Sequence, residues 1–197
     1  QIHKPPFALF CKGDLNLLKG FKKNVAFVGS REPSEYASKQ LPLLVKDIAL
    51  DHVIVSGCAI GIDTLAHQSA IAYKGKTIGV LGSGIDVPYP HSNLSLINEI
   101  AANHLLISEY PAGVPAKAEH FIPRNRIIVG ICNSIVVFDA KKSSGTISTA
   151  YKAANENRNL LTIPYPLGTP YLNNSLIKEG CHLIETGDDI RFLDENF

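Results

Sequence analysis

Short blocks of apolar residues alternate with longer stretches of mixed polarity along most of the chain. Within each block the apolar residues are nearly continuous, which is typical of strands buried on both faces of a sheet. We expect strands at residues 24–28, 52–55, 77–81, 105–108, 134–138, 159–163 and 182–184. The stretches between them predict helices near residues 34–50, 63–73, 93–103, 124–132, 146–157, 174–178 and 188–193. The pattern therefore predicts an α/β fold with a mainly parallel sheet and helices on both faces.

Local signals refine some of these boundaries. Ser34 is a suitable N-cap for the first helix, and Pro42 is expected to kink that helix or restart it. Residues 1–23 lack the strand–helix rhythm, although residues 8–10 could add an edge strand. Residues 109–120 form a long loop rich in Pro, Ala and Gly, which is a candidate lid or binding arm.

The composition narrows the class of protein. The length of 197 residues and the hydrophobic content of 45% suit one domain over residues 1–197, with no run long enough to span a membrane. The cysteines lie far apart, at Cys11, Cys58, Cys132 and Cys181. That spacing predicts neither a disulfide framework nor a metal site and favours the reducing cytoplasm. The net charge of +1 means that any nucleic-acid site must be a local cationic cluster.

Loops suited to phosphate follow several of the expected strands. They contain Gly, Ser, Thr and Arg, whose backbone N–H groups, hydroxyls and guanidinium forks bind phosphate oxygens. The loops are Val28–Arg31, Ser56–Asp63, Phe121–Arg126 and Ser143–Ala150. Because ligands of parallel sheets bind at the carboxyl ends of the strands, these loops predict one extended phosphate ligand, such as a nucleic-acid strand.

The basic and aromatic candidates each have a structural alternative. Arg31 should project at the end of the first strand, or it is an ordinary surface arginine. Arg124 and Arg126 flank Asn125 at an expected helix start, where a cation is unfavourable unless an anion binds. Phe121 could pack inward or stack on a base.

The loops that contain glycine and serine also allow more than one interpretation. In the loop Ser56–Asp63, the two glycines before the helix, Gly57 and Gly61, could form an anion nest or simply pack tightly. Asp63 is expected to cap the next helix, with His67 pairing to it. At the later loop, Lys141 and Lys142 precede a serine- and glycine-containing helix start that favours a phosphate.

Catalytic groups are few. Glu109 is the best-placed carboxylate, but it has no evident partner acid, and no nucleophile or metal motif is present in the sequence. We expect no cofactor, no metal and no enzymatic activity.

Ordered motifs along nearly the whole chain resemble the DNA-processing protein A family, called DprA or Smf. The motifs are LFCKGD at Leu9–Asp14, VGSR at Val28–Arg31, SGCAIGIDTLAH at Ser56–His67, ISEYPAG at Ile107–Gly113, FIPRNRII at Phe121–Ile128, SSGTISTA at Ser143–Ala150 and NNSLIKEG at Asn173–Gly180.

The resemblance implies an extended Rossmann-like domain that binds single-stranded DNA. It further implies protection of incoming DNA in natural transformation, loading of the RecA recombinase, and a homodimer. The apolar residues Leu172, Leu176 and Ile177 near the C-terminus are candidate interface residues, and a core role is the equal alternative for each. Longer family members add a helical domain before this one and a winged-helix domain after it, and we expect no winged-helix domain here. The DNA-binding residues are expected to be Gly29, Ser30, Arg31, Ser56, Gly57, Lys117, Phe121, Arg124, Asn125, Arg126, Ser143, Ser144, Gly145 and Thr146.

The rival hypothesis is an enzyme. The same region resembles, more distantly, the lysine-decarboxylase-like nucleotide phosphoribohydrolases, whose GGxGTxxE loop supplies a glutamate for hydrolysis. Here Gly145 and Thr146 align with the GT pair, and the glutamate position is Thr149. Without that acid, glycosidic cleavage lacks a proton-transfer partner, which favours the binding protein.

Overall fold

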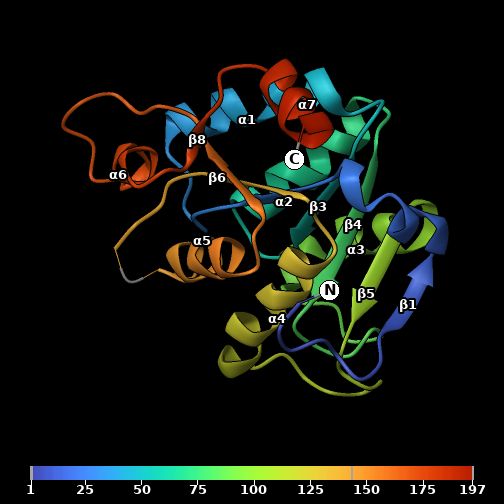
Figure 1. Cartoon of the computed structure of the whole chain (residues 1–197). Helices are drawn as coiled ribbons and strands as arrows, with labels where there is room; N and C mark the ends of the chain where they lie inside the picture. Colours follow the sequence, from blue (N-terminus) through green and yellow to red (C-terminus); the bar gives the residue numbers. More distant parts are fainter. Residues whose placement is uncertain (1, 143, 197) are drawn as a thin grey trace.

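The computed structural model describes residues 2–142 and 144–196. Their strands form one sheet in the order β1-β5-β4-β3-β2-β6-β7-β8, parallel throughout except for β1, which pairs antiparallel with β5 (Figure 1). The strands are β1 Phe10–Gly13, β2 Asn24–Val28, β3 Val53–Gly57, β4 Lys76–Leu81, β5 Leu105–Ser108, β6 Ser134–Val137, β7 Asn159–Thr162 and β8 His182–Leu183. The predicted α/β fold with a mainly parallel sheet is confirmed.

The strand order is that of a doubly wound Rossmann-like sheet, extended at one side. From β2 the chain winds outward through β3 and β4 to β5, then crosses back so that β6 lies against β2. The register pairs Val28 with Val137, and the Phe138 N–H donates to the Val28 carbonyl (2.9 Å). The loops that follow β2 and β6 therefore leave the sheet side by side, at the point where the winding reverses direction and where such sheets bind ligands.

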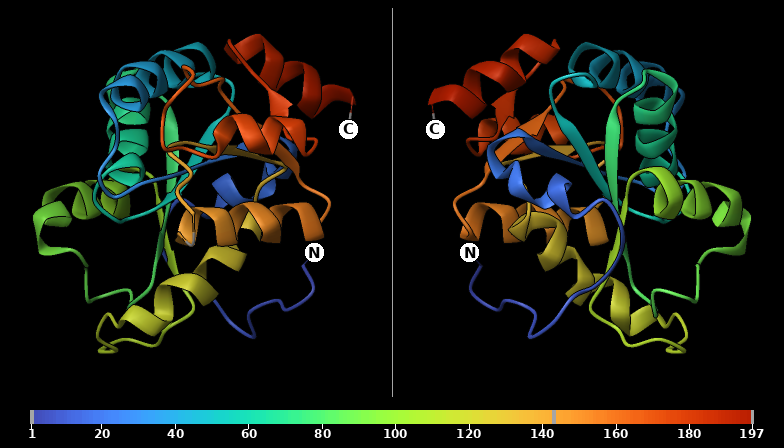
Figure 2. Two further views of the ribbon diagram at one scale, coloured as in Figure 1. Left: turned by 90° about the vertical axis from the view of Figure 1, so that its left-hand side faces the viewer. Right: turned by 90° about the vertical axis from the view of Figure 1, so that its right-hand side faces the viewer.

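Helices cover both faces of the sheet, as predicted (Figure 2). On β2, Val25 and Phe27 pack in a cluster with α1, α2 and α7, whereas Ala26 and Val28 pack on the other face with α4, α5 and α6. Because successive side chains of a strand point to opposite faces, a strand covered on both sides needs apolar residues at every position. The helices are α1 Glu35–Ile48, α2 Ile62–Ala72, α3 Leu94–Asn103, α4 Ala118–Gly130, α5 Gly145–Asn155, α6 Asn173–Lys178 and α7 Gly187–Asn196.

Three local predictions concern the N-terminal part of the chain. Ser34 caps α1 as predicted, its hydroxyl accepting from the Ala37 N–H (3.1 Å). Pro42 lies inside one continuous helix, so the expected restart there is wrong. The edge strand predicted at residues 8–10 exists but lies slightly later, at Phe10–Gly13, where β5 offers it a free edge.

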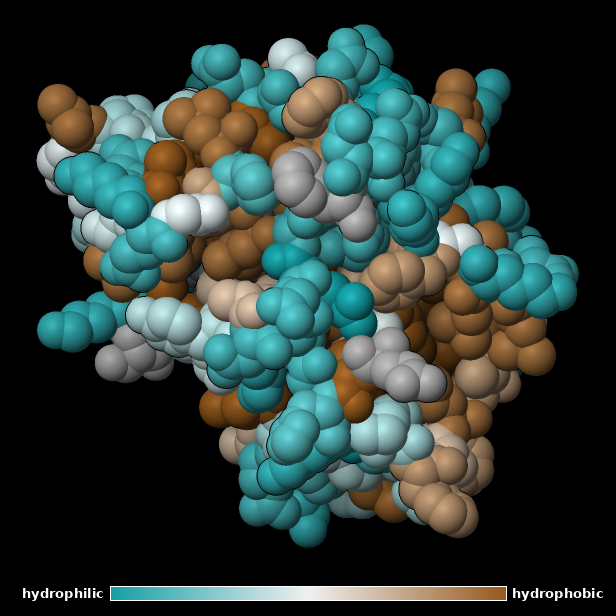
Figure 3. All heavy atoms as spheres, viewed as in Figure 1, coloured by the Kyte–Doolittle hydropathy of each residue, from teal (hydrophilic) through white to brown (hydrophobic). Residues whose placement is uncertain are grey.

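The long loop at residues 109–117 is held in place. The Gly84 N–H donates to the Val114 carbonyl, and the Gly113 N–H donates to Asp86 Oδ1, both at 2.8 Å. These two hydrogen bonds attach the loop to the segment that follows β4, and its role as a lid or a binding arm stays a prediction. None of the described helices is long and apolar enough to cross a membrane. Figure 3 shows hydrophilic side chains spread over one face, interrupted by separate hydrophobic groups.

Candidate functional site: a cationic cleft at the carboxyl edge of the sheet

A cleft of about 530 Å³ lies at the carboxyl edge of the sheet, where the loops after β2 and β6 meet α4 and α5. It brings together segments that are far apart in the sequence. Ten of the residues predicted from sequence line it: Gly29, Ser30, Arg31, Lys117, Phe121, Arg124, Asn125, Ser144, Gly145 and Thr146. The cleft thus unites most of the predicted DNA-binding residues at the topological reversal of the sheet.

The backbone of the cleft is suited to an anion. A Cβ at Gly29 would lie 2.6 Å from Ile62 Cγ1 and 2.7 Å from the Phe138 carbonyl oxygen, so only glycine lets the chain pass here. Ser144 caps α5, its hydroxyl accepting from the Ile147 N–H (3.3 Å). Gly145 opens the helix with free space beside its Cα. The amides and the dipole of this helix start favour a phosphate group. The predicted Ser143 lies outside the described residues.

Three exposed cations surround this helix start. Arg31 makes no ion pair within the described ranges, and its guanidinium lies over the Phe121 ring, 5.3 Å from the centroid. Lys141 lines the cleft from the β6 side, with its ammonium 6.0 Å from the Tyr171 ring centre. Lys117 is 3.9 Å from the exposed Glu119, an ion pair that solvent weakens. These side chains can turn toward a phosphate without breaking a buried contact.

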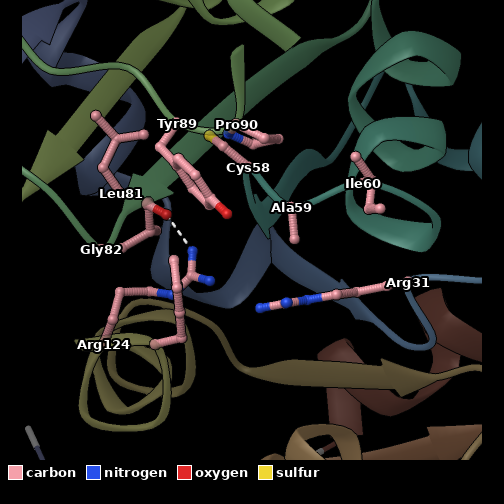
Figure 4. Close-up of a pocket in the computed structure, with 11 residues that line it drawn as sticks. Arg31, Cys58, Ala59, Ile60, Leu81, Gly82, Tyr89, Pro90 and Arg124 are labelled. Atoms are coloured by element: carbon pink, nitrogen blue, oxygen red, sulfur yellow. Dashed lines mark hydrogen bonds between the residues drawn. The ribbon is translucent and has the colours of Figure 1, made fainter. Parts of the chain in front are cut away.

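Arg124 also lines the cleft, but unlike these three cations it is buried. Only 5% of it is exposed, its Nη1 donates to the Val80 carbonyl, and its Nε has no hydrogen-bond partner among the described atoms. Burial lowers its pKa, whereas the nearby Asp63 raises it. Figure 4 shows Arg31 and Arg124 reaching from opposite sides toward the same space, beside Tyr89. Arg124 therefore forms part of the cleft floor.

The helix-dipole argument for the two α4 arginines is wrong. The helix begins at Ala118, not near residue 124, because α4 continues through Pro123. Arg124 and Arg126 consequently lie beyond the first turn, where the dipole has little effect.

Three other predicted site residues lie away from the cleft lining. Arg126 forms an ion pair with Glu109 (Nη1 to Oε2, 2.8 Å) and donates through Nε to the Lys4 carbonyl. Ser56 is fully buried, and its hydroxyl donates to the Phe27 carbonyl (2.6 Å). Gly57 ends β3 beneath the floor. The side chains of Arg126 and Ser56 are thus bonded within the protein, and none of the three residues lines the cleft.

The structural interpretation of Asp63 and His67 needs correction. Gly61, not Asp63, is the N-cap of α2, and Asp63 lines the cleft instead. His67 does not pair with Asp63, because its Nε2 contacts the Gly57 carbonyl (2.5 Å) and its Nδ1 contacts Thr77 Oγ1 (2.6 Å).

Further residues line the cleft that the sequence did not predict as ligand-binding, among them Tyr89 and Asp139. Asp139 is fully enclosed and accepts from the Ser34 N–H (2.5 Å) and hydroxyl (2.7 Å) and from the Tyr165 hydroxyl (2.9 Å). It joins the end of β6 to the start of α1 and thereby fixes the cleft wall. The position of Asp139 directly after a buried strand is the sequence signal that could have identified it as a lining residue. Tyr89, 47% exposed, follows no strand directly and carried no comparable signal.

The groups that the rival hydrolase would need are engaged elsewhere. Both carboxylate oxygens of Glu109 are bound by Arg126, and Glu109 is not among the residues lining the cleft. Thr149, at the position of the hydrolase glutamate, donates its hydroxyl to the Gly145 carbonyl (2.9 Å) and accepts from Asn125 Nδ2 (2.8 Å).

Several known proteins are similar to this chain over nearly all of its length. Residues 1–193 match the family described as DNA recombination-mediator protein A. The chain is 42% identical to the DNA processing protein DprA of Streptococcus pneumoniae, over 96% of this chain and 67% of that protein. It is 39% identical to the Bacillus subtilis protein of the same name, over 96% of this chain and 65% of that protein. A solved structure from Helicobacter pylori, described by its single-stranded DNA binding mode, matches with a TM-score of 0.90 and 30% identity, covering 100% of this chain and 91% of that one.

Proposed function

Because the chain belongs to the DNA recombination-mediator protein A family, we propose that its cleft binds single-stranded DNA without base preference. The observation that carries the proposal is that one cleft is lined both by exposed Arg31, which forms no ion pair with the described residues, and by the open start of α5 at Gly145. A guanidinium fork and free backbone N–H groups hold phosphate oxygens. Such contacts position a strand but read no sequence.

The role of the longer protein rests on its relatives. The chain spans about two thirds of the two DNA processing proteins named above. We propose that the whole protein protects incoming DNA during natural transformation, works in the cytoplasm and helps to load the RecA recombinase. We propose that it acts by binding and not by catalysis, because Thr149 stands at the position of the hydrolase glutamate and Arg126 binds both carboxylate oxygens of Glu109.

The first test is a salt series with a thymidine oligonucleotide. We expect tight binding at low salt and a linear fall of log K with log salt concentration, with a slope of about −0.7 for each phosphate neutralised. Fluorescence anisotropy of a labelled oligonucleotide measures the slope. Oligonucleotides of other sequences should give the same affinity within a few fold.

Two controls accompany this series. Blunt duplex of the same length should bind more weakly, and equal or tighter duplex binding would contradict the proposal. Nucleoside monophosphates incubated with the protein should release no free base on chromatography. Release that disappears in Glu109→Gln would instead favour the hydrolase.

We further propose that the protein forms a homodimer through the edge of the sheet at β8. Of the interface residues suggested by the sequence, Leu176 is buried in the core and Leu172 packs against it. Ile177 is half-buried, and Leu183 on the edge strand is 46% exposed. An edge strand that carries an exposed leucine is a suitable surface for pairing with a second copy of the chain.

Sedimentation tests the dimer. We expect a dimer at micromolar concentration and a monomer for Leu183→Glu, because a charge there would be desolvated in the interface. Leu43→Glu on α1 is the matched control, since Leu43 is 54% exposed and lies on a different element. A wild-type monomer, or a Leu183→Glu dimer, would exclude this interface.

A further inference from the structure

A carboxylate lies among the arginines of the cleft. Asp63, in the first turn of α2, lines the cleft and is only 9% exposed. Its Oδ2 accepts one long hydrogen bond from the Ala59 N–H (3.3 Å). Within residues 2–142 and 144–196 it forms no ion pair. A negative charge in this position opposes a second negative charge entering the same cleft.

Gly57 allows this carboxylate to face Arg124. A Cβ at Gly57 would collide with Asp63 Oδ2 and with both Nη atoms of Arg124. The two side chains therefore meet across the space that the missing side chain leaves, close to each other without direct contact. Arg124 in turn has a buried Nε without a partner. The guanidinium of Arg124 therefore neutralises the carboxylate of Asp63 only in part. A bound anion would compete with Asp63 for that positive charge.

The groups that face Asp63 come from three other elements. Arg124 projects from α4, Arg31 from the loop after β2, and Cys58 and Ser56 from the end of β3. Burial raises the pKa of the Asp63 carboxyl, whereas Arg124, the Ala59 N–H and Arg31 lower it. Burial raises the pKa of the Cys58 thiol to about 12, so Cys58 stays neutral. Asp63 is thus the acid in this group whose protonation depends on the balance between its burial and the neighbouring cations.

We propose that Asp63 takes up a proton from solution when a single strand enters the cleft, so that binding becomes tighter as the pH falls. This rests on the proposed function above. A phosphate that approaches Arg31 competes with Asp63 for the same positive charge, and its own negative charge disfavours the ionised carboxylate. The carboxylate gains one proton and becomes a neutral acid, and no other bond changes. By linkage, the ligand and the proton then favour each other equally.

The test measures binding of a thymidine oligonucleotide to the wild type and to Asp63→Asn across pH. For the wild type we expect the Kd to decrease by up to about tenfold per unit of falling pH between the pKa values of the free and bound states. The carboxamide of Asp63→Asn mimics the neutral acid, so its Kd should match the low-pH wild type at every pH. Calorimetry in buffers of different ionisation enthalpy should show uptake of up to one proton by the wild type and none by the variant.

Glu32→Gln is the matched control. Glu32 is exposed beside Arg31, so its removal should shift the Kd alike at every pH and keep the proton uptake. If Asp63→Asn fails to fold, the wild-type calorimetry still decides, because absence of proton uptake overturns the inference. Equal uptake by a folded Asp63→Asn also overturns it, while leaving strand binding intact. Absence of oligonucleotide binding at every pH and salt overturns the proposed function instead.

Discussion

Replacing Arg124 with alanine is expected to lower the free energy of unfolding by about 3 kcal/mol, because the change removes the cation that faces a buried carboxylate. Asp63 would be left opposite an empty space, and the Val80 carbonyl would lose its donor. Urea denaturation at neutral pH measures the loss. Reduced DNA binding by this variant would then follow from a disordered cleft floor as much as from a lost contact.

Arg31→Ala is the matched comparison. Arg31 is exposed and makes no ion pair in the described parts of the chain, so its removal should change stability by less than about 0.5 kcal/mol. It should still weaken strand binding by about tenfold or more, the value of one charged hydrogen bond. If Arg124→Ala were as stable as Arg31→Ala, Arg124 would be a freely available ligand group and the present assignment would be wrong.

Acid is expected to destabilise the fold through His67. Burial lowers the pKa of His67 from 6.5 to about 4, partly offset by its bond to the Gly57 carbonyl. The unfolded chain therefore binds this proton first. The contribution of neutral His67 is complete above pH 6.5 and is lost as the pH falls toward 4, for a total of about 3 kcal/mol.

His67→Gln isolates this effect. Glutamine stays neutral and can still donate to the Gly57 carbonyl, so its urea-unfolding free energy should fall less steeply between pH 6.5 and pH 4. Burial also lowers the pKa of His104, so some acid sensitivity remains in both proteins. The prediction therefore concerns the difference between the two proteins in how steeply the unfolding free energy falls with pH. Equal slopes for the wild type and His67→Gln would show that His67 does not control acid stability.

The sequence by itself determined the sheet, its helices and the segments that form the cleft. Near-continuous apolar blocks such as Val25–Val28 have no other solution than a strand covered on both faces, and loops at the carboxyl ends of parallel strands must lie at one edge. Glycine and serine at Gly29 and Ser144 marked where the backbone approaches a ligand. These features depend on residues that are neighbours in the sequence, and so they can be recognised without the tertiary structure.

Only the tertiary structure decided what each polar side chain does. Arg31, Arg124 and Arg126 are equivalent cations in the sequence, yet one is exposed, one is buried against Asp63 and one is paired with Glu109. That division depends on which residues of distant segments arrive within a few ångströms, because desolvation and Coulomb energies vary steeply over that range. For the same reason Asp63 appeared from sequence to be a helix cap, and the fold places it in the cleft.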